Sequence, residues 1–234
     1  MTAARSQTTV PAVLVPHARC PNGETATPVL FLGDPRTLRC RLLGLICSVR
    51  CPGSIVIHTF DAMRALRDAG VVVIGGFHSP MERECLDILL RGSQPIIICA
   101  AKRLRGLRIG AAARKALKDG RLLVITPFGD PIKRTTAAQA VQRNELVAAM
   151  ADAVLVPYAV PGGRAEATAR NILARGQPLF TFADEGNATL IGAGAEVYGV
   201  GRVKSLLAEA VLGGSASAGG SVFHRLGCRP FLPC

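Results

Sequence analysis

The segment that decides the fold is VVVIGGFHSPMERECLDILLRGSQPIIICAA, Val71 to Ala101. Two short apolar runs, 71–74 and 95–99, flank a segment with helical character that is led by Pro80 and Glu82. This pattern predicts a strand, a helix and a second strand, and the two strands of such a unit lie parallel, with helices over both faces of the sheet. Ligands of these sheets gather at the carboxyl ends of the strands. The turn from Gly75 to Glu82 is therefore the first place to expect a functional site.

The alternation of strand and helix patterns extends from residue 42 to residue 183. Ser54 and either Thr135 or Thr136 are expected to cap two of the helices. We expect an α/β protein with a doubly wound, Rossmann-like parallel sheet of about six strands and helices on both faces. Further strands are predicted at 28–33, 42–47, 122–126, 153–158 and 179–182, and further helices at 54–69, 109–118, 135–151, 165–175 and 203–211.

The two ends of the chain differ in composition from this central part. Residues 1–27 show no periodicity and predict a poorly ordered lead-in. Residues 213–234 open with GGSASAGGS, which is flexible-linker composition, so the expected Rossmann-like core is 28–212. No apolar run reaches the roughly 18 residues that a membrane helix needs. We expect a cytoplasmic protein without a membrane partner.

The charge of the chain favours a polyanionic partner, because 28 Lys and Arg residues against 16 Asp and Glu residues give a net charge of +12. Eight of the basic residues lie in the segment from Lys102 to Arg121, which contains the single acid Asp119. Such a segment is either a solvated helix face or a nucleic-acid contact, and the sequence leaves both open.

The eight cysteines are scattered, and two of them, Cys85 and Cys99, fall inside a predicted helix and a predicted strand. Free, buried thiols are therefore expected rather than a disulfide framework. Cys47 and Cys51 are the only close pair, and no second pair follows at zinc-finger spacing. We expect neither a metal nor a cofactor.

The turn Gly75-Gly76-Phe77-His78-Ser79-Pro80 does not have the GxGxxG pattern, and no acid follows at the distance that a dinucleotide ribose needs. It offers two glycines, a hydroxyl and the first amides of a helix, which suit a phosphate, and His78 is a candidate ligand contact. A tight turn that needs positive φ is an equally good interpretation.

A second turn of this kind is Pro161-Gly162-Gly163, at the end of another predicted strand. It resembles the PGGxGTxxE signature of the cytokinin-activating phosphoribohydrolases, but this chain reads PGGRAEATA, with Ala169 at the place of the terminal glutamate. Without that carboxylate an enzyme is not expected. If hydrolysis were retained, Glu82 and Glu166 are the candidate carboxylates.

Several segments together resemble the DNA-processing protein A family (DprA, also called Smf). PVLFLGD at 28–34 is similar to the opening strand of that family. LLGLICSVRCPG at 42–53 is similar to the strand that ends in Gly-Ser-Arg, with Cys47 at the glycine, Val49 at the arginine and Arg50 one place later. VVVIGGFHSPMERE at 71–84 is similar to the phosphate-binding turn of the family, with Gly76 matched and Pro80 in place of its second glycine.

The later segments continue the resemblance in the same order. Gln142 to Glu145 is similar to an Arg-Asn-Arg helix, with Arg143 and Asn144 matched and Glu145 reversing a charge. PGGRAEATARNILARGQPLF at 161–180 is similar to the block in which Thr-Ala-Arg precedes Gly-x-x-Val-Phe. In total the resemblance spans about 28–182.

The resemblance implies a protein that binds single-stranded DNA without catalysis and loads a RecA-type recombinase in DNA recombination and natural transformation, often as a homodimer. Phe77 or Phe128 is expected to offer a stacking face for bases. The alternatives are a phosphoribohydrolase-like nucleotide enzyme and a sensor of a nucleotide signal. The residues expected to bind DNA or its phosphates are Arg50, Gly75, Gly76, Phe77, His78, Ser79, Lys133, Arg134, Arg143, Asn144, Gly162 and Gly163.

Overall fold

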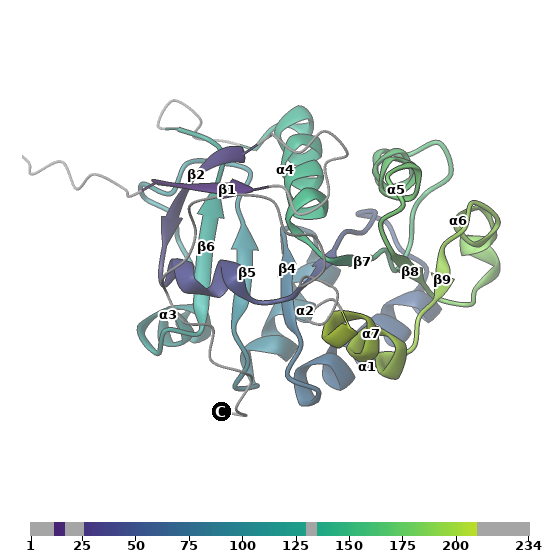
Figure 1. The fold of residues 1–234 in the computed structure, drawn as a ribbon, viewed down its shortest axis with the longest axis horizontal. Coiled ribbons are helices and arrows are strands. Elements are labelled where there is room, and N and C mark those ends of the chain that lie inside the picture. The colour runs from purple at the N-terminus through teal and green to yellow at the C-terminus, as the bar shows by residue number, and fades with distance from the viewer. Residues whose placement is uncertain (1–11, 17–25, 130–134, 210–234) are drawn as a thin grey trace, which may run out of the picture.

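The computed structural model describes residues 12–16, 26–129 and 135–209 of the chain. In these residues nine strands form one sheet, in the order β1-β2-β6-β5-β4-β3-β7-β8-β9 (Figure 1). The strands are β1 (Ala12–Pro16), β2 (Ala26–Leu32), β3 (Leu42–Leu45), β4 (Val72–Gly75), β5 (Ile96–Cys99), β6 (Leu122–Thr126), β7 (Ala153–Leu155), β8 (Leu179–Thr181) and β9 (Glu196–Val197). The α-helices are α1 (Gly53–Asp68), α2 (Pro80–Leu90), α3 (Ala111–Lys118), α4 (Ala137–Met150), α5 (Arg164–Ala174), α6 (Ala188–Gly192) and α7 (Val200–Glu209).

The central part of the sheet is parallel, which confirms the predicted α/β, Rossmann-like fold. Strand β3 pairs in parallel with β4 on one side and with β7 on the other, and β5, β6, β8 and β9 continue the parallel pairing outward. Strands β2 and β1 then add an antiparallel edge next to β6. Because the chain fills one side of β3 before it crosses to β7, the strand order reverses between β3 and β7, which is where such sheets open a crevice.

Helices cover both faces of this sheet. In Figure 1, α4 and α5 lie on one side of it, and α1, α2 and α7 lie on the other. Side chains alternate along each strand, so Leu43 and Leu45 of β3 pack under α1 and α2, whereas Leu42 packs under α4. Each face therefore has its own buried apolar core, as the near-continuous apolar strands predict.

Two predictions about local structure are wrong. Ser54 does not cap α1, because Pro52 is the N-cap residue, and the Ser54 hydroxyl instead donates to Asp184 at 3.4 Å. Ala12–Pro16 is a strand and not part of an unstructured lead-in, since it pairs with β2. The sheet also contains two strands that were not predicted: β1, a short apolar run inside the expected lead-in, and β9, which has only two residues. The linker-like segment 213–234 lies outside the described residues.

Candidate functional site

Three loops that carry predicted site residues lie at one edge of the sheet, which we call the carboxyl edge. Strands β3 to β8 all run in the same direction, so the loops that follow them emerge at this edge. The loop after β3 carries Arg50, and the loop after β4 carries the turn that opens with Gly76. The loop after β7 carries Gly162 and Gly163. Parallel strand direction thus brings together three segments that are far apart in the sequence.

Arg143 and Gly76 are in direct contact at this edge. Arg143 lies on α4 and is only 5% exposed, and its guanidinium covers the backbone of Gly76 so closely that a Cβ at that position would overlap it. The Arg143 Nε donates to Oδ1 of Asn144 at 2.7 Å. Gly76 is therefore required by the neighbouring arginine and not by its own backbone angles, because neither it nor Gly75 has a positive φ.

The two terminal nitrogens of Arg143 have no hydrogen-bond or ion-pair partner among the described residues. A buried cation without a carboxylate partner is costly, and an anionic ligand is the usual compensation. A planar guanidinium with two free N–H groups is well suited to bind a phosphate. This combination makes Arg143 the strongest anion-binding candidate in the described part of the chain.

The amides at the start of α2 are occupied by a side chain of the same helix. The N–H groups of His78 and Ser79 donate to Oε2 of Glu82 at 3.0 and 2.9 Å, while the Ser79 hydroxyl accepts from the Glu82 N–H at 3.2 Å. This reciprocal arrangement is a capping box. The expected phosphate contact from the Ser79 amide is therefore wrong for this conformation, because Glu82 already takes the position of the anion. The His78 side chain is exposed.

The second glycine turn is closed in the same way. The Gly162 N–H donates to Oε2 of Glu166 at 2.5 Å, and the Gly163 N–H donates to the carbonyl oxygen of Val160 at 2.8 Å. Oε1 of Glu166 accepts from Arg170 at 2.7 Å. The hydrogen bond from Gly162, followed by the one from Arg170, lowers the pKa of the Glu166 carboxyl. Neither glycine amide is free to bind a phosphate in this conformation.

Arg50 lies in the loop after β3, beside the point where the strand order reverses. That loop is fixed to the loop after β7, because the Ser48 N–H donates to the Tyr158 carbonyl at 3.0 Å and the Ser48 hydroxyl accepts from the Val160 N–H at 2.9 Å. Arg50 itself is exposed, and no ion-pair partner is found for it in the described ranges. It is thus available to an anion at the carboxyl edge.

The aromatic prediction is wrong, since neither phenylalanine offers an exposed ring. Phe77 is 6% exposed and Phe128 is 7% exposed. Phe77 has a φ of 47°, which turns its ring back onto the core, with its Cζ 3.3 Å from where a Cβ of Gly75 would stand. The exposed apolar side chains at this edge are Val49, at 71%, and Val160, at 38%.

Comparison with solved structures agrees with this fold. DNA processing protein A from Helicobacter pylori, a protein that binds single-stranded DNA, superposes with a TM-score of 0.63 at 18% identity, over 78% of this chain and 87% of that chain. DNA processing protein A from Streptococcus pneumoniae superposes with a TM-score of 0.64 at 17% identity, over 78% of this chain and 66% of that chain. This chain has the DprA fold. No protein-family model matches the sequence, and no curated protein sequence matches it.

The Rossmann-like fold is shared more widely than DprA. The molybdenum cofactor binding protein from Rippkaea orientalis superposes with a TM-score of 0.50 at 11% identity, over 74% of this chain and 98% of that chain. Identities this low establish the fold alone, so the function of the carboxyl edge depends on its own residues.

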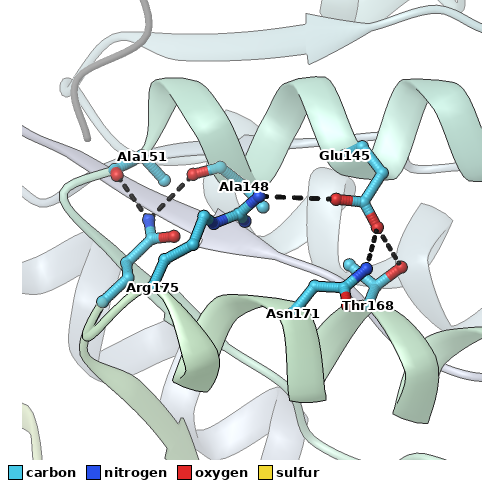
Figure 2. A network of polar contacts seen from close by, with 7 residues as sticks. Glu145, Ala148, Ala151, Thr168, Asn171 and Arg175 are labelled. Atoms are coloured by element: carbon cyan, nitrogen blue, oxygen red, sulfur yellow. Dashed lines mark hydrogen bonds and ion pairs between the residues drawn. The ribbon is translucent and has the colours of Figure 1, made fainter. Parts of the chain in front are cut away.

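Glu145 departs from the DprA pattern, and its surroundings explain why. Figure 2 shows its carboxylate between α4 and α5, facing two side chains of α5 and that of Arg175, the residue that follows the helix. It accepts hydrogen bonds from Thr168 at 3.0 Å and Asn171 at 3.5 Å, and Arg175 lies 3.7 Å from its Oε2. Next to it, Gln177 donates to the carbonyl oxygens of Ala148 and Ala151. Glu145 on α4 therefore bonds to side chains on and just after α5, which holds the two helices together.

Other predicted features are placed as follows. Lys133 and Arg134 lie outside the described residues. Among the residues that are described, no group of three or more His, Cys, Asp or Glu side chains is arranged to hold a metal ion. None of the described helices is long and apolar enough to cross a membrane.

Sequence reasoning named Glu82 and Glu166 only as candidate catalytic carboxylates and missed that they close the two glycine turns. The signal for Glu82 was present in the sequence, because Ser79 followed three residues later by a glutamate is the pattern of a capping box. Glu166 stands at the equivalent third position of α5. No sequence signal indicated that the guanidinium of Arg143 would cover Gly76, since this contact joins residues 67 positions apart.

Proposed function

We propose that this chain binds single-stranded DNA without catalysis at the carboxyl edge of its sheet. The observation that carries the proposal is the buried Arg143 guanidinium, whose terminal nitrogens are unpartnered among the described residues and lie against Gly76. A phosphate placed there would accept two N–H groups from one planar donor. Arg50 would add charge from the adjacent loop.

The two arginines at this edge, Arg50 and Arg143, suit recognition of the sugar-phosphate backbone. Val49 and Val160 provide exposed apolar surface beside Arg50, against which bases can pack whatever their sequence. Binding through phosphates makes affinity fall steeply with salt concentration. We therefore expect tight but sequence-tolerant binding at low salt.

The proposal extends to the work of DprA proteins in recombination. Single-stranded DNA held along an open edge remains accessible to a second protein, so a RecA-type recombinase is the expected partner in loading. A homodimer would place two such edges on one strand and raise the effective affinity. Both the recombinase and the homodimer are parts of the proposal.

The experiment that tests this function is a titration of a labelled, single-stranded oligonucleotide over a series of salt concentrations. We expect salt-dependent binding by the native protein. Arg143→Ala should weaken it about tenfold or more and reduce the slope of log affinity against log salt by about 1, because one phosphate contact is lost. Arg143→Lys should recover only part of the affinity, since it retains the charge without the planar pair of donors.

The matched control is Arg64→Ala. Arg64 lies in the second half of α1, is exposed and is paired with Asp61 at 2.6 Å. The Arg64→Ala variant loses the same charge as Arg143→Ala, but at a site far from the carboxyl edge. Its affinity for DNA should therefore stay nearly unchanged. Equal losses in the two arginine variants, or binding that is indifferent to salt, would contradict the proposal. Thermal unfolding of each variant separates a lost contact from a lost fold.

The enzyme alternative has a specific observation against it. Its two candidate carboxylates, Glu82 and Glu166, are both engaged by backbone N–H groups of their own turns. A carboxylate held in this way is a poor general base, because its lone pairs are already in use. Incubation with nucleoside monophosphates should release no free base, and release of free base would favour the phosphoribohydrolase alternative.

A further inference from the structure

The loop after β5, residues 100–110, brings a group of basic side chains to the carboxyl edge. Strand β5 lies between β4 and β6 and runs parallel to both, so this loop emerges beside the turn that opens with Gly76 (Figure 1). The register agrees, because Gly75 pairs with Ile98 near the end of β5. The loop is therefore the neighbour of the Arg143 site on the β5 side.

Apolar and basic side chains alternate in this loop, which reads AKRLRGLRIG over 101–110. Leu104 is 6% exposed and belongs to the core under α1 and α2, and Leu107 packs against the same core. The Leu107 N–H donates to the Leu104 carbonyl oxygen at 2.9 Å, which closes a tight turn. Because the apolar side chains face inward, Arg105 and Arg108 are left exposed. The fold therefore holds the basic side chains at the surface.

The protein does not neutralise this basic surface with its own acids. Asp119 is the only acid from 102 to 121, and it is paired with Lys115 of α3 at 2.7 Å. Lys102 and Arg108 have no ion-pair partner among the described residues. Neighbouring cations repel one another, and a bound polyanion would relieve this repulsion.

The other end of the carboxyl edge carries acidic side chains. The loop after β8, residues 182–187, contains Asp184 and Glu185 and no basic residue. The charge along the edge therefore changes from positive beside β5 to negative beside β8. A polyanion bound at Arg143 is attracted toward β5 and repelled from β8.

We propose that single-stranded DNA bound at Arg143 continues over the end of β5 onto Lys102 and Arg108, and does not extend toward β8. The path rests on the proposed function, since it concerns the same ligand at the same edge. Neighbouring strands lie about 4.8 Å apart, so the end of β5 is within reach of a DNA strand that is held at Gly76. Exposed cations contact phosphates whatever the base, so this part of the path is tolerant of sequence and sensitive to salt.

The test is a titration of a labelled, single-stranded oligonucleotide of about 16 nucleotides against the native protein and the double variant Lys102→Ala/Arg108→Ala. We expect the variant to bind about tenfold more weakly at about 0.1 M salt. The slope of log affinity against log salt should fall by about 1.4, because each of the two lost phosphate contacts contributes about 0.7. Thermal unfolding of the variant checks that the fold is retained.

The matched control is the double variant Arg64→Ala/Lys204→Ala, which also loses one arginine and one lysine. Both side chains are exposed, and their helices, α1 and α7, pack together at the opposite end of the sheet from α3 (Figure 1). The affinity of this control should change by less than about twofold. Equal losses in the two double variants would show that only net charge matters, and would overturn the path.

Two further variants separate the path from the site where it starts. If Arg143→Ala weakens binding and Lys102→Ala/Arg108→Ala does not, the proposed function stands and the path is overturned. If only the double variant weakens binding, the basic loop is supported as a DNA contact and the Arg143 site is overturned. Glu185→Gln should leave the affinity unchanged, and a gain of several-fold would place the DNA beside β8, against the path. Failure of the oligonucleotide to bind at low salt would overturn both proposals.

Discussion

The turn between β4 and α2 and the turn between β7 and α5 begin alike and end differently. Both place a pair of glycines at the carboxyl edge, and both have a glutamate at the third position of the following helix that accepts backbone N–H groups, Glu82 in the first turn and Glu166 in the second. In the first turn, the buried guanidinium of Arg143 covers Gly76. In the second, the space beside Gly162 is open, and its φ is +71°.

The comparison teaches that a glycine-rich turn at a strand end is not by itself an anion site. In each turn a backbone N–H at or before the N-cap of the helix donates to the glutamate at the third helical position, so a carboxylate already stands beside the start of each helix. What distinguishes the first turn is a cation supplied by a different helix. The capacity to bind phosphate at this edge therefore depends on Arg143 of α4 more than on the amides of the turns.

We expect the largest difference between the two turns when one glycine in each is replaced by alanine. Gly76→Ala places a methyl group where the Arg143 guanidinium lies, so the guanidinium must move. We expect an affinity loss for single-stranded DNA similar to that of Arg143→Ala, about tenfold, with little loss of stability because the displaced group is the end of a flexible side chain. Oligonucleotide titration and urea unfolding measure the two effects.

Gly162→Ala is the matched variant, and it should show the reverse pattern. Its methyl group meets no other atom within 4 Å, but the left-handed backbone costs about 1–2 kcal/mol for a residue with a Cβ. Stability should fall while the affinity for DNA stays close to that of the native protein. If Gly76→Ala and Gly162→Ala lowered affinity equally, the distinction between the two turns would be wrong.

The next largest effect is expected at Glu145, where the chain departs from the DprA pattern. Glu145→Arg removes the acceptor of the buried Thr168 hydroxyl and brings a second cation toward Arg175. A buried hydroxyl without a partner costs about 1–3 kcal/mol, so we expect a loss of that order in the free energy of unfolding, measured in urea. Affinity for DNA should not rise, because Glu145 faces α5.

Glu145→Gln provides the control for this experiment. Its amide oxygen can still accept from Thr168, so most of the stability should remain. A gain in DNA affinity in Glu145→Arg without loss of stability would show that position 145 faces the nucleic acid and not α5.

The sequence predicted the fold well because that information is local. Apolar runs such as Val71 to Ile74 and caps such as Thr136 are visible within a few residues, and the parallel order follows from them. The site was predicted less well because its decisive contacts are non-local. Nothing near Phe77 indicated that its ring would turn inward, and nothing near Glu145 indicated a partner on another helix.

The smallest expected effect is a difference in pH dependence caused by Glu166. Its pKa is lowered by the Gly162 N–H and by Arg170, so its charged form stabilises the folded state above the ordinary value of 4.5, and this contribution is lost as pH falls through the lowered pKa. Glu166→Gln retains an acceptor for Gly162 but has no charge to lose. The variant should therefore be less stable than the native protein near neutral pH, and the difference should vanish in acid.

Urea unfolding over a pH series measures this difference in stability, with Glu84→Gln on the exposed side of α2 as the control. A constant difference at every pH would mean that Glu166 acts through the shape of its side chain and not through its charge, and the β7–α5 turn would then be held by packing alone.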